Sequence, residues 1–284
     1  MRLKNAKSGK TVEFMPHIPT RTDRALADSG GMLGPRILVF DIETTPMLSW
    51  HWRCFKENIS PVQIVKFTRV LCWAAKWLDN DCVMFDSTQR DGEDDKRCCK
   101  TLWKLCNDAD ILVAHNGRAF DMGTLRARWL AHYQEPPAPS RWVDTLRVAR
   151  GRFKFPSNRL DGIARYLGLG SKLGHEGFQL WLDCMTGDKA AWRTMEEYNI
   201  NDVLLDEEVY LKIRAWDSQH PNVSLLYGDG QDRCVVCGGR NFKALNQKAY
   251  TAASEFDARR CVTCKTVMRS RKRTDRRASH ATIA

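Results

Sequence analysis

The stretch that decides the fold is Ile37-Leu38-Val39-Phe40-Asp41-Ile42-Glu43-Thr44-Thr45-Pro46. Its first four residues are apolar and rich in strand formers, which predicts a strand buried on both faces of a sheet. Side chains alternate along a strand, so Asp41 and Glu43 point to one side and Ile42 to the other. Two like charges at the edge of a core repel each other and are costly to desolvate. A cation between them would offset this cost, and we therefore predict half of a divalent-metal site here.

The composition is that of a packed protein with one or two domains. The chain has 284 residues, of which 43% are hydrophobic and ten are tryptophan. No apolar run approaches the ~20 residues of a membrane span, so no membrane partner is expected. The N-terminus carries no apolar signal core, which favours a cytoplasmic protein, in a host or bacterial cytosol. Eleven cysteines without a secretion signal indicate thiols and metal ligands rather than disulfides.

The net charge of +11 is concentrated near the C-terminus. From Tyr227 onward there are 13 of the 45 Lys and Arg residues but only 5 of the 34 Asp and Glu residues. This last fifth of the chain therefore carries +8, and residues 1–226 carry only +3. A basic excess of this kind is typical of a segment that meets a polyanion.

The order of elements predicts a mixed α/β sheet flanked by helices over residues 36–218. Residues 1–35 lack periodicity and are expected to form a flexible arm. Strands are expected after the opening stretch at 69–78 and 81–85, joined as an antiparallel meander, and later at 110–117 and 142–145. Helices are expected at 94–107, from 120, around 159–167 and over 188–216.

Three more side chains complete a candidate site. Asp121 lies in the first turn of the helix that follows the strand at 110–117, close to the strand end. Tyr198 and Asp202 are four residues apart on the last long helix and so share one helix face. Together with Asp41 and Glu43 they give the order D-x-E, D, Y-x-x-x-D. Hard carboxylate oxygens of this kind select Mg²⁺ or Mn²⁺.

This order resembles the DEDD 3′–5′ exonucleases of the RNase H-like superfamily, in the subgroup with a tyrosine before the last aspartate (DEDDy). Residues 41–45, 115–121 and 198–202 resemble its three motifs. The other subgroup has a histidine five residues before the last aspartate, where this chain has Glu197. The resemblance covers roughly residues 36–216 and is nearest to proofreading exonuclease subunits of phage and bacterial replication. It implies an RNase H-like fold and two active-site metal ions.

By this resemblance, Asp41 bridges both ions, and Glu43 and Asp202 bind the ion that carries the attacking water. Asp121 holds the second ion through water. Tyr198 orients the attacking water, because a phenol with a pKa near ~10 is a poor base at neutral pH. Residues expected to grip the terminal nucleotide by hydrogen bonding or stacking are Thr44, Met47, Leu48, Asn116 and Phe120.

Each motif also has a structural interpretation. Asp-x-Glu after a strand is often a polar strand end, and Tyr-x-x-x-Asp is usually a solvated helix face. His115 is as well explained as a hydrogen-bonded residue at a strand end as by a catalytic role. Asp144 could assist metal binding or could cap the turn that follows it, and it is left outside the catalytic set.

A second motif lies at residues 228–268. Cys234 and Cys237 form one Cys-x-x-Cys pair, and Cys261 and Cys264 form another after 23 intervening residues. This spacing predicts a zinc ribbon with one structural Zn²⁺ held by four thiolates. So few residues bury little core, and metal binding would supply most of the folding free energy. Residues 269–284 are expected to be a basic, disordered tail that binds phosphates or docks to a protein.

The leading hypothesis is a metal-dependent 3′–5′ exonuclease that hydrolyses phosphodiester bonds from the 3′ end of single-stranded DNA. It would act in DNA processing, or proofread in trans with a DNA polymerase or another replisome protein. One alternative is a 3′–5′ exoribonuclease with the same site, because the motifs do not read the 2′-hydroxyl. The other is a non-catalytic nucleic-acid-binding protein on the same fold.

Overall fold

A seven-stranded mixed sheet forms the centre of the computed structural model, which describes residues 2–5, 11–12, 34–78, 80–171, 174 and 177–274. The strand order is β2-β1-β7-β6-β3-β8-β9. The strands are β1 (Arg2–Asn5), β2 (Thr11–Val12), β3 (Ile37–Thr44), β6 (Val70–Trp77), β7 (Cys82–Ser87), β8 (Ile111–Ala114) and β9 (Arg141–Asp144). β3 pairs antiparallel with β6 and parallel with β8, so the opening stretch lies in the middle of the sheet.

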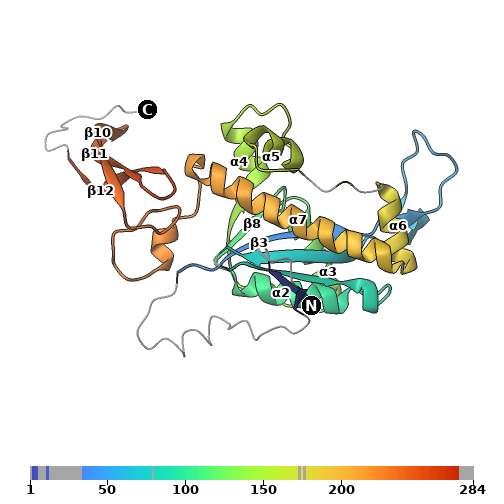
Figure 1. Ribbon diagram of the computed structural model, residues 1–284. Coiled ribbons are helices and arrows are strands. Elements are labelled where there is room, and N and C mark those ends of the chain that lie inside the picture. The colour runs from blue at the N-terminus through green and yellow to red at the C-terminus, as the bar shows by residue number, and fades with distance from the viewer. Residues whose placement is uncertain are drawn as a thin grey trace.

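Helices cover both faces of the sheet, as Figure 1 shows. One face carries α2 (Lys96–Asp108) and α3 (Asp121–Ala131), and its core includes Leu38, Phe40 and Ile42. The other carries the long α7 (Lys189–Ile213), and its core includes Ile37 and Val39. The period of two along β3 thus sends Asp41 and Glu43 toward the α7 face. The predicted mixed α/β sheet flanked by helices is confirmed.

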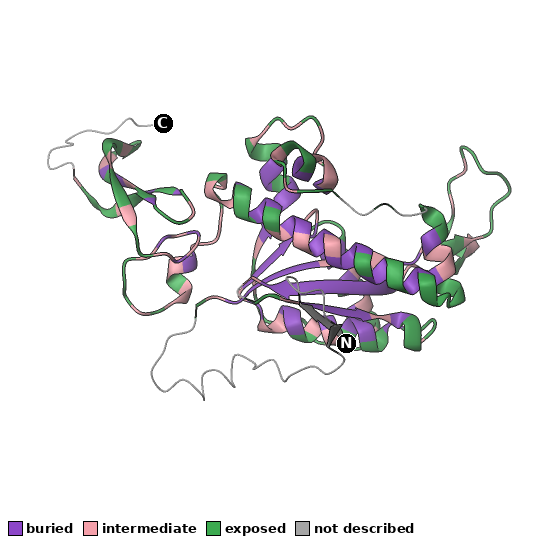
Figure 2. Cartoon of the chain, viewed as in Figure 1, coloured by how far each residue is buried: buried purple, intermediate pink, exposed green. Residues whose placement is uncertain are grey.

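Three shorter helices pack beside α7: α4 (Thr145–Arg152), α5 (Leu160–Leu167) and α6 (Phe178–Thr186). A buried ion pair between Lys76 on β6 and Glu207 on α7, at 2.6 Å, also joins α7 to the sheet. The central strands β3, β6, β7 and β8 and the middle of α7 are mostly buried (Figure 2). No helix in the described part of the chain has an apolar stretch long enough to cross a membrane.

Two predicted tails differ from the structure where it describes them. Residues 2–5 and 11–12, expected in a flexible arm, form β1 and β2, and β1 pairs antiparallel with β7. The rest of residues 1–33 lies outside the described residues. At the other end, Arg269–Arg273 belong to strand β12 (Val267–Arg273) rather than to a disordered tail, and residues 275–284 lie outside the described residues.

The C-terminal unit is a three-stranded antiparallel sheet of β10 (Phe242–Thr251), β11 (Ser254–Cys261) and β12. Two short 3₁₀ helices, at Arg214–Trp216 and Val223–Leu226, connect it to α7. The Tyr227 side chain packs against both Gly34 and Gly238, and an added Cβ on Gly238 would lie 2.4 Å from the Tyr227 hydroxyl oxygen and 2.5 Å from the ring. Side chains larger than glycine are therefore excluded at position 238, where φ is also +72°.

Candidate active site

Three carboxylates come together between β3 and α7. Asp41 and Glu43 on β3 and Asp202 on α7 each place a carboxylate oxygen within 4.8 Å of the others. Asp202 is buried, and the two strand residues are half-buried. The β3–β6 register shifts between Glu43 and Thr44, so the strand bends at the residue after the pair. Like charges this close in a partly buried position repel each other, and a bound cation would remove the repulsion.

Asn199, which the sequence analysis missed, orients the first of these carboxylates. Its Nδ2 donates to Asp41 Oδ2 at 2.7 Å, and its Oδ1 accepts from Cys72 Sγ at 3.8 Å. Asn199 is fully buried. Burial and the nearby Glu43 charge raise the pKa of Cys72, which keeps this thiol protonated as a donor. The amide is therefore fixed with its N–H toward Asp41.

Asp121 lies outside the group of three. Its Oδ1 accepts the backbone N–H of Ile42 at 3.2 Å, between the two strand carboxylates in sequence. The pairing of β3 with β8 ends at Val39, so the backbone N–H of Ile42 has no partner on β8. Asp121, the first residue of α3, accepts this hydrogen bond instead. Burial raises the pKa of Asp121 well above the usual range of a carboxyl group. Asp121 therefore lies beside the three carboxylates, and a cation bound among them would lower the pKa of Asp121 and favour loss of its proton.

Tyr198 is buried one turn before Asp202 on α7. Its ring packs edge-on against Trp181 of α6, with ring centroids 6.1 Å apart and an interplanar angle of 72°. The contact limits the directions that the ring can take. The i, i+4 spacing places its phenol and the Asp202 carboxylate on the same side of the helix.

The turn between β8 and α3 has a backbone that few residues can adopt. Asn116 has φ +67°, and a Cβ on Gly117 would lie 2.3 Å from the Cβ of Ala114. Asp144, at the N-terminus of α4, accepts the backbone N–H groups of Asn116 and Arg147, each at 3.2 Å. Asp144 therefore caps α4 and fixes this turn, as in the capping interpretation of the sequence.

A buried hydrogen-bond chain links Asp206 on α7 to His115 at the end of β8. Thr145 Oγ1 donates to Asp206 Oδ1 at 2.6 Å and lies 3.0 Å from His115 Nδ1. His115 Nε2 lies 3.0 Å from the carbonyl oxygen of Asn158, which can only accept, so Nε2 carries a hydrogen. With both ring nitrogens engaged, His115 fits the structural interpretation.

Asp206 is therefore a second buried carboxyl on the face of α7 that carries Asp202. Burial raises its pKa to about 7, against the lowering effect of the hydrogen bond from Thr145. The negative charges of Asp144, Asp121 and Asp202 raise the pKa further. Sequence spacing could have found this residue and Asn199, because residues 199, 202 and 206 follow the i, i+3, i+7 rule of one helix face.

Asp206→Asn should flatten the pH dependence of stability in protein free of divalent ions. Folded Asp206 keeps its proton up to about pH 7, whereas an ordinary aspartate has a pKa of 3.8. The folded state binds more protons over this window, so the free energy of unfolding falls as pH rises from about 4 to 7. Between pH 5 and 8 the melting temperature should therefore fall less in the variant than in the parent. The difference should be about 2–4 °C for each kcal/mol by which the ionised Asp206 lowers the free energy of unfolding of the parent.

Thermal unfolding followed by circular dichroism at several pH values measures this difference. Glu208→Gln, an exposed change on the same helix, is the matched control and should keep the parent profile. Parallel profiles for Asp206→Asn and the parent would show that Asp206 does not carry the pH dependence.

The five predicted substrate-binding residues lie at or after the ends of the two strands β3 and β8 along the chain and differ in exposure. Met47 and Leu48 follow β3 and are about half exposed, at 47% and 53%, and Phe120 at the start of α3 is exposed at 48%. Thr44 and Asn116 are half-buried. The three apolar side chains are therefore available to a ligand, and the two polar ones are partly enclosed by the protein.

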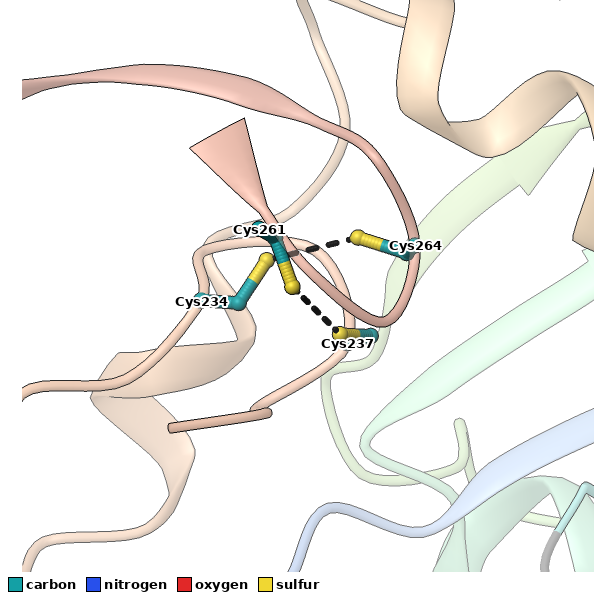
Figure 3. A group of neighbouring side chains, drawn as sticks. All are labelled: Cys234, Cys237, Cys261 and Cys264. Carbon is teal, nitrogen blue, oxygen red and sulfur yellow. Dashed lines mark hydrogen bonds between the residues drawn. The ribbon is translucent and has the colours of Figure 1, made fainter. Parts of the chain in front are cut away.

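The C-terminal cysteines form a site suited to zinc. The four sulfur atoms lie within 4.8 Å of one another, with 3.5 Å between Cys234 and Cys264 and 3.6 Å between Cys237 and Cys261. Figure 3 shows the four side chains pointing toward one another. Tetrahedral zinc with bonds of about 2.3 Å places sulfurs about 3.8 Å apart, so the cluster fits a four-thiolate ion. The predicted zinc ribbon matches this cluster.

A third cluster of possible metal ligands contains an aspartate that already forms a salt bridge. Asp95, Cys99 and His132 lie close together, but Arg128 donates to both carboxylate oxygens of Asp95, at 2.8 and 2.6 Å. Asp95 also accepts the backbone N–H of Val70 at 2.9 Å. Burial raises the pKa of the Cys99 thiol far above its usual range. The carboxylate is thus already neutralised by a fixed guanidinium, which leaves no place for a cation.

A comparison with models of known protein families identifies one family for this chain. A family model described as the RNase H superfamily matches residues 69–214, just over half of the chain, from β6 to the end of α7. The match includes Asp121, Tyr198 and Asp202 and begins after Asp41 and Glu43. No curated protein matches the sequence.

One similar solved structure is that of the family B DNA polymerase from the hyperthermophilic archaeon Pyrobaculum calidifontis. It aligns with 19% identity and a TM-score of 0.48, over 64% of this chain and 26% of the polymerase chain. The chain thus spans about a quarter of that polymerase. The family match, together with the mixed sheet flanked by helices, shows that the chain belongs to the RNase H superfamily.

Proposed function

We propose that the protein is a metal-dependent 3′–5′ exonuclease of the DEDDy type that degrades single-stranded DNA. The observation that carries the proposal is the convergence of Asp41, Glu43 and Asp202 within 4.8 Å from two elements far apart in sequence. Membership of the RNase H superfamily supports nuclease activity in general. The 3′ polarity, the preference for DNA and a role beside a DNA polymerase rest on the motif resemblance.

The carboxylate set suits two Mg²⁺ or Mn²⁺ ions, because oxygen donors dominate and no thiolate or imidazole ligand is among them. We assign Asp41, Glu43 and Asp202 as direct ligands and Asp121 as a ligand through water. The ions would supply charge neutralisation at the scissile phosphate and promote attack by water. The water oxygen forms the new bond to phosphorus and loses a proton to solvent, and the bond from phosphorus to the 3′-oxygen breaks, after which this oxygen takes up a proton from solvent. The products are a nucleoside 5′-monophosphate and a strand with a new 3′-hydroxyl.

The protein side chains orient the reaction in this proposal. Asn199 holds Asp41 in one rotamer, which lowers the entropy lost when a ligand binds. Tyr198 orients the attacking water from the same helix face as Asp202. The terminal nucleotide contacts Thr44, Met47, Leu48, Asn116 and Phe120, and the exposed Phe120 ring offers a stacking surface.

The ribbon and the basic residues after it are proposed to bind the nucleic acid backbone or a replisome protein. The Arg269 guanidinium stacks over Phe256 at 4.0 Å, which holds it on the ribbon surface. Arg259 stacks over Phe242 in the same way, but its guanidinium is ion-paired with Asp232. Such an array contacts phosphates without reading sequence.

Time-resolved digestion of 5′-labelled single-stranded and double-stranded DNA and RNA in Mg²⁺ tests the function. We expect single-stranded DNA to shorten one nucleotide at a time from the 3′ end, giving a ladder that moves from long to short products. Faster shortening of RNA would select the exoribonuclease alternative. Internal products at the earliest times, or no cleavage of any substrate, would contradict the exonuclease proposal.

A further inference from the structure

An exposed loop leaves the sheet directly after the candidate active site. Residues 46–68, here called the aromatic loop, connect β3 to β6 and include β4 (Leu48–Ser49) and β5 (Ile64–Lys66). The base of the loop is closed by two hydrogen bonds between Thr45 and Arg69, at 2.9 and 3.1 Å. Figure 1 shows the aromatic loop in blue, projecting at the right of the molecule, and Figure 2 shows that most of it is exposed.

Four aromatic side chains of this loop stand in solvent. The exposed fractions are 76% for Trp50, 93% for Trp52, 82% for Phe55 and 68% for Phe67. One exposed aromatic residue needs no explanation, but four within 23 residues are unusual, because each such ring could bury about 150–250 Å² of surface. The rings are therefore available to a partner.

The backbone that carries these rings is ordered by local hydrogen bonds. The Glu57 carboxylate accepts the backbone N–H groups of Trp52 and Arg53, with the shortest contact at 2.8 Å. The Gln63 side chain donates to the carbonyl of Trp50 at 2.9 Å and accepts the N–H of Ser60 at 2.8 Å. These bonds limit the cost of ordering the loop when a partner binds.

The charges of the loop favour an anionic partner. Arg53 and Lys56 lie among the aromatic residues, and the single acidic residue of the loop, Glu57, already binds two backbone N–H groups. The third basic residue, Lys66, is ion-paired with Glu93 outside the loop. Bases stack on aromatic rings while basic side chains track the phosphates, a combination typical of proteins that bind single strands. A duplex encloses the flat faces of its bases and offers no such partner along its length.

We propose that the aromatic loop is a stacking surface for the bases of a single-stranded nucleic acid whose end occupies the Asp41–Glu43–Asp202 site. The assignment rests on the proposed nuclease function for the identity of the ligand. Trp52 and Phe55 are its principal contacts, and Trp50 and Phe67 extend the surface toward β3 and β6. The loop thereby selects unpaired strands, which the carboxylates alone do not do.

Binding of a labelled oligothymidylate of about 20 nucleotides, measured by fluorescence anisotropy, tests the proposal. The measurement uses the full-length chain with Asp202→Ala, so that the strand is not cleaved. Trp52→Ala and Trp52→Leu should each weaken binding by about tenfold, and Trp52→Phe by no more than about threefold. Binding of a blunt duplex of the same sequence length should be unchanged.

Tyr133→Ala is the matched control, since Tyr133 is equally exposed, at 93%, and lies outside the loop. It should bind the oligothymidylate as the parent does. Because Trp52 is exposed, its variants should also keep the parent melting temperature. The proposal would be overturned if Trp52→Ala or Trp52→Leu bound the oligothymidylate as tightly as the Asp202→Ala chain without a loop substitution. It would also be overturned if that chain did not bind the oligothymidylate at all.

Loop-dependent binding is separable from catalysis. If the loop variants lose binding while the unsubstituted protein cleaves nothing, the nuclease function is wrong and the stacking surface stands. If the unsubstituted protein degrades single strands and the loop variants bind and cleave equally well, the stacking surface is wrong and the nuclease function stands.

Discussion

Asp202→Ala should lower the rate of phosphodiester hydrolysis in Mg²⁺ by about three orders of magnitude or more. Asp202 is buried and supplies the only carboxylate of the group that comes from α7. Its removal leaves two oxygen donors from one strand, which cannot enclose a cation. Single-turnover digestion of labelled single-stranded DNA measures the loss, and Asp41→Ala should give the same result. Hydrolysis within tenfold of the parent in either variant would rule out this carboxylate group as the active site.

A loss of activity must be distinguished from a loss of folding. Asp202→Ala removes one of three mutually repelling carboxylates, so the metal-free variant should melt at the parent temperature or above it. In the parent, Mg²⁺ should raise the melting temperature by linkage, and in the variant this rise should disappear. Glu208→Ala, an exposed change on the same helix, should keep both the activity and the Mg²⁺ effect.

Asn199→Ala should lower the rate of hydrolysis less than Asp202→Ala does and more than Glu208→Ala does. The hydrogen bond from Asn199 to Asp41 orients the carboxylate without replacing it, and loss of such a supporting contact typically costs about 10–100-fold in metal affinity or activity. If the loss is in metal affinity, a higher Mg²⁺ concentration should restore part of the rate. A rate that stays low at saturating Mg²⁺ would assign Asn199 a role beyond holding Asp41.

Periodicity predicted the parts of the molecule that local sequence controls. The alternation along Ile37–Glu43 predicted that both strand carboxylates lie on one side of the strand, and the structure shows that α7 covers that side. The i, i+4 spacing predicted that Tyr198 and Asp202 share one face of the last long helix. These placements depend on a few neighbouring residues. The contacts of Asn199 and Asp206 were missed because their partners, Asp41 and Thr145, are distant in sequence.

Two strands that the sequence did not predict are stabilised by pairing with a neighbouring strand of the same chain. Arg2–Asn5 carries no strand pattern, yet its backbone pairs with β7 at the edge of the sheet. Arg269–Arg273 has the composition of a disordered tail, but it pairs with β11, and the Arg269 guanidinium stacks on Phe256. In both cases the hydrogen bonds of another strand outweigh weak local preference.

Cys261→Ser should abolish zinc binding and unfold the ribbon while the α/β domain stays folded. The apolar core of the ribbon is small, and its buried members are Cys234, Val236, Cys261 and Met268. Two of these belong to the four-cysteine cluster, so a zinc ion bound there would supply most of what holds β10, β11 and β12 together. A structural zinc ion contributes about 10–16 kcal/mol to folding in small fingers, far more than this core could supply.

Zinc content and limited proteolysis measure the effect. The parent should contain one zinc per chain and resist cleavage within residues 228–274, whereas Cys261→Ser should contain none and be cut there. Cys54→Ser is the matched control, because Cys54 is exposed and lies outside the cluster. The α/β domain should keep its melting transition in both variants, since its two cores share no residue with the ribbon core. Full zinc content in Cys261→Ser would mean that the four thiols do not form one site.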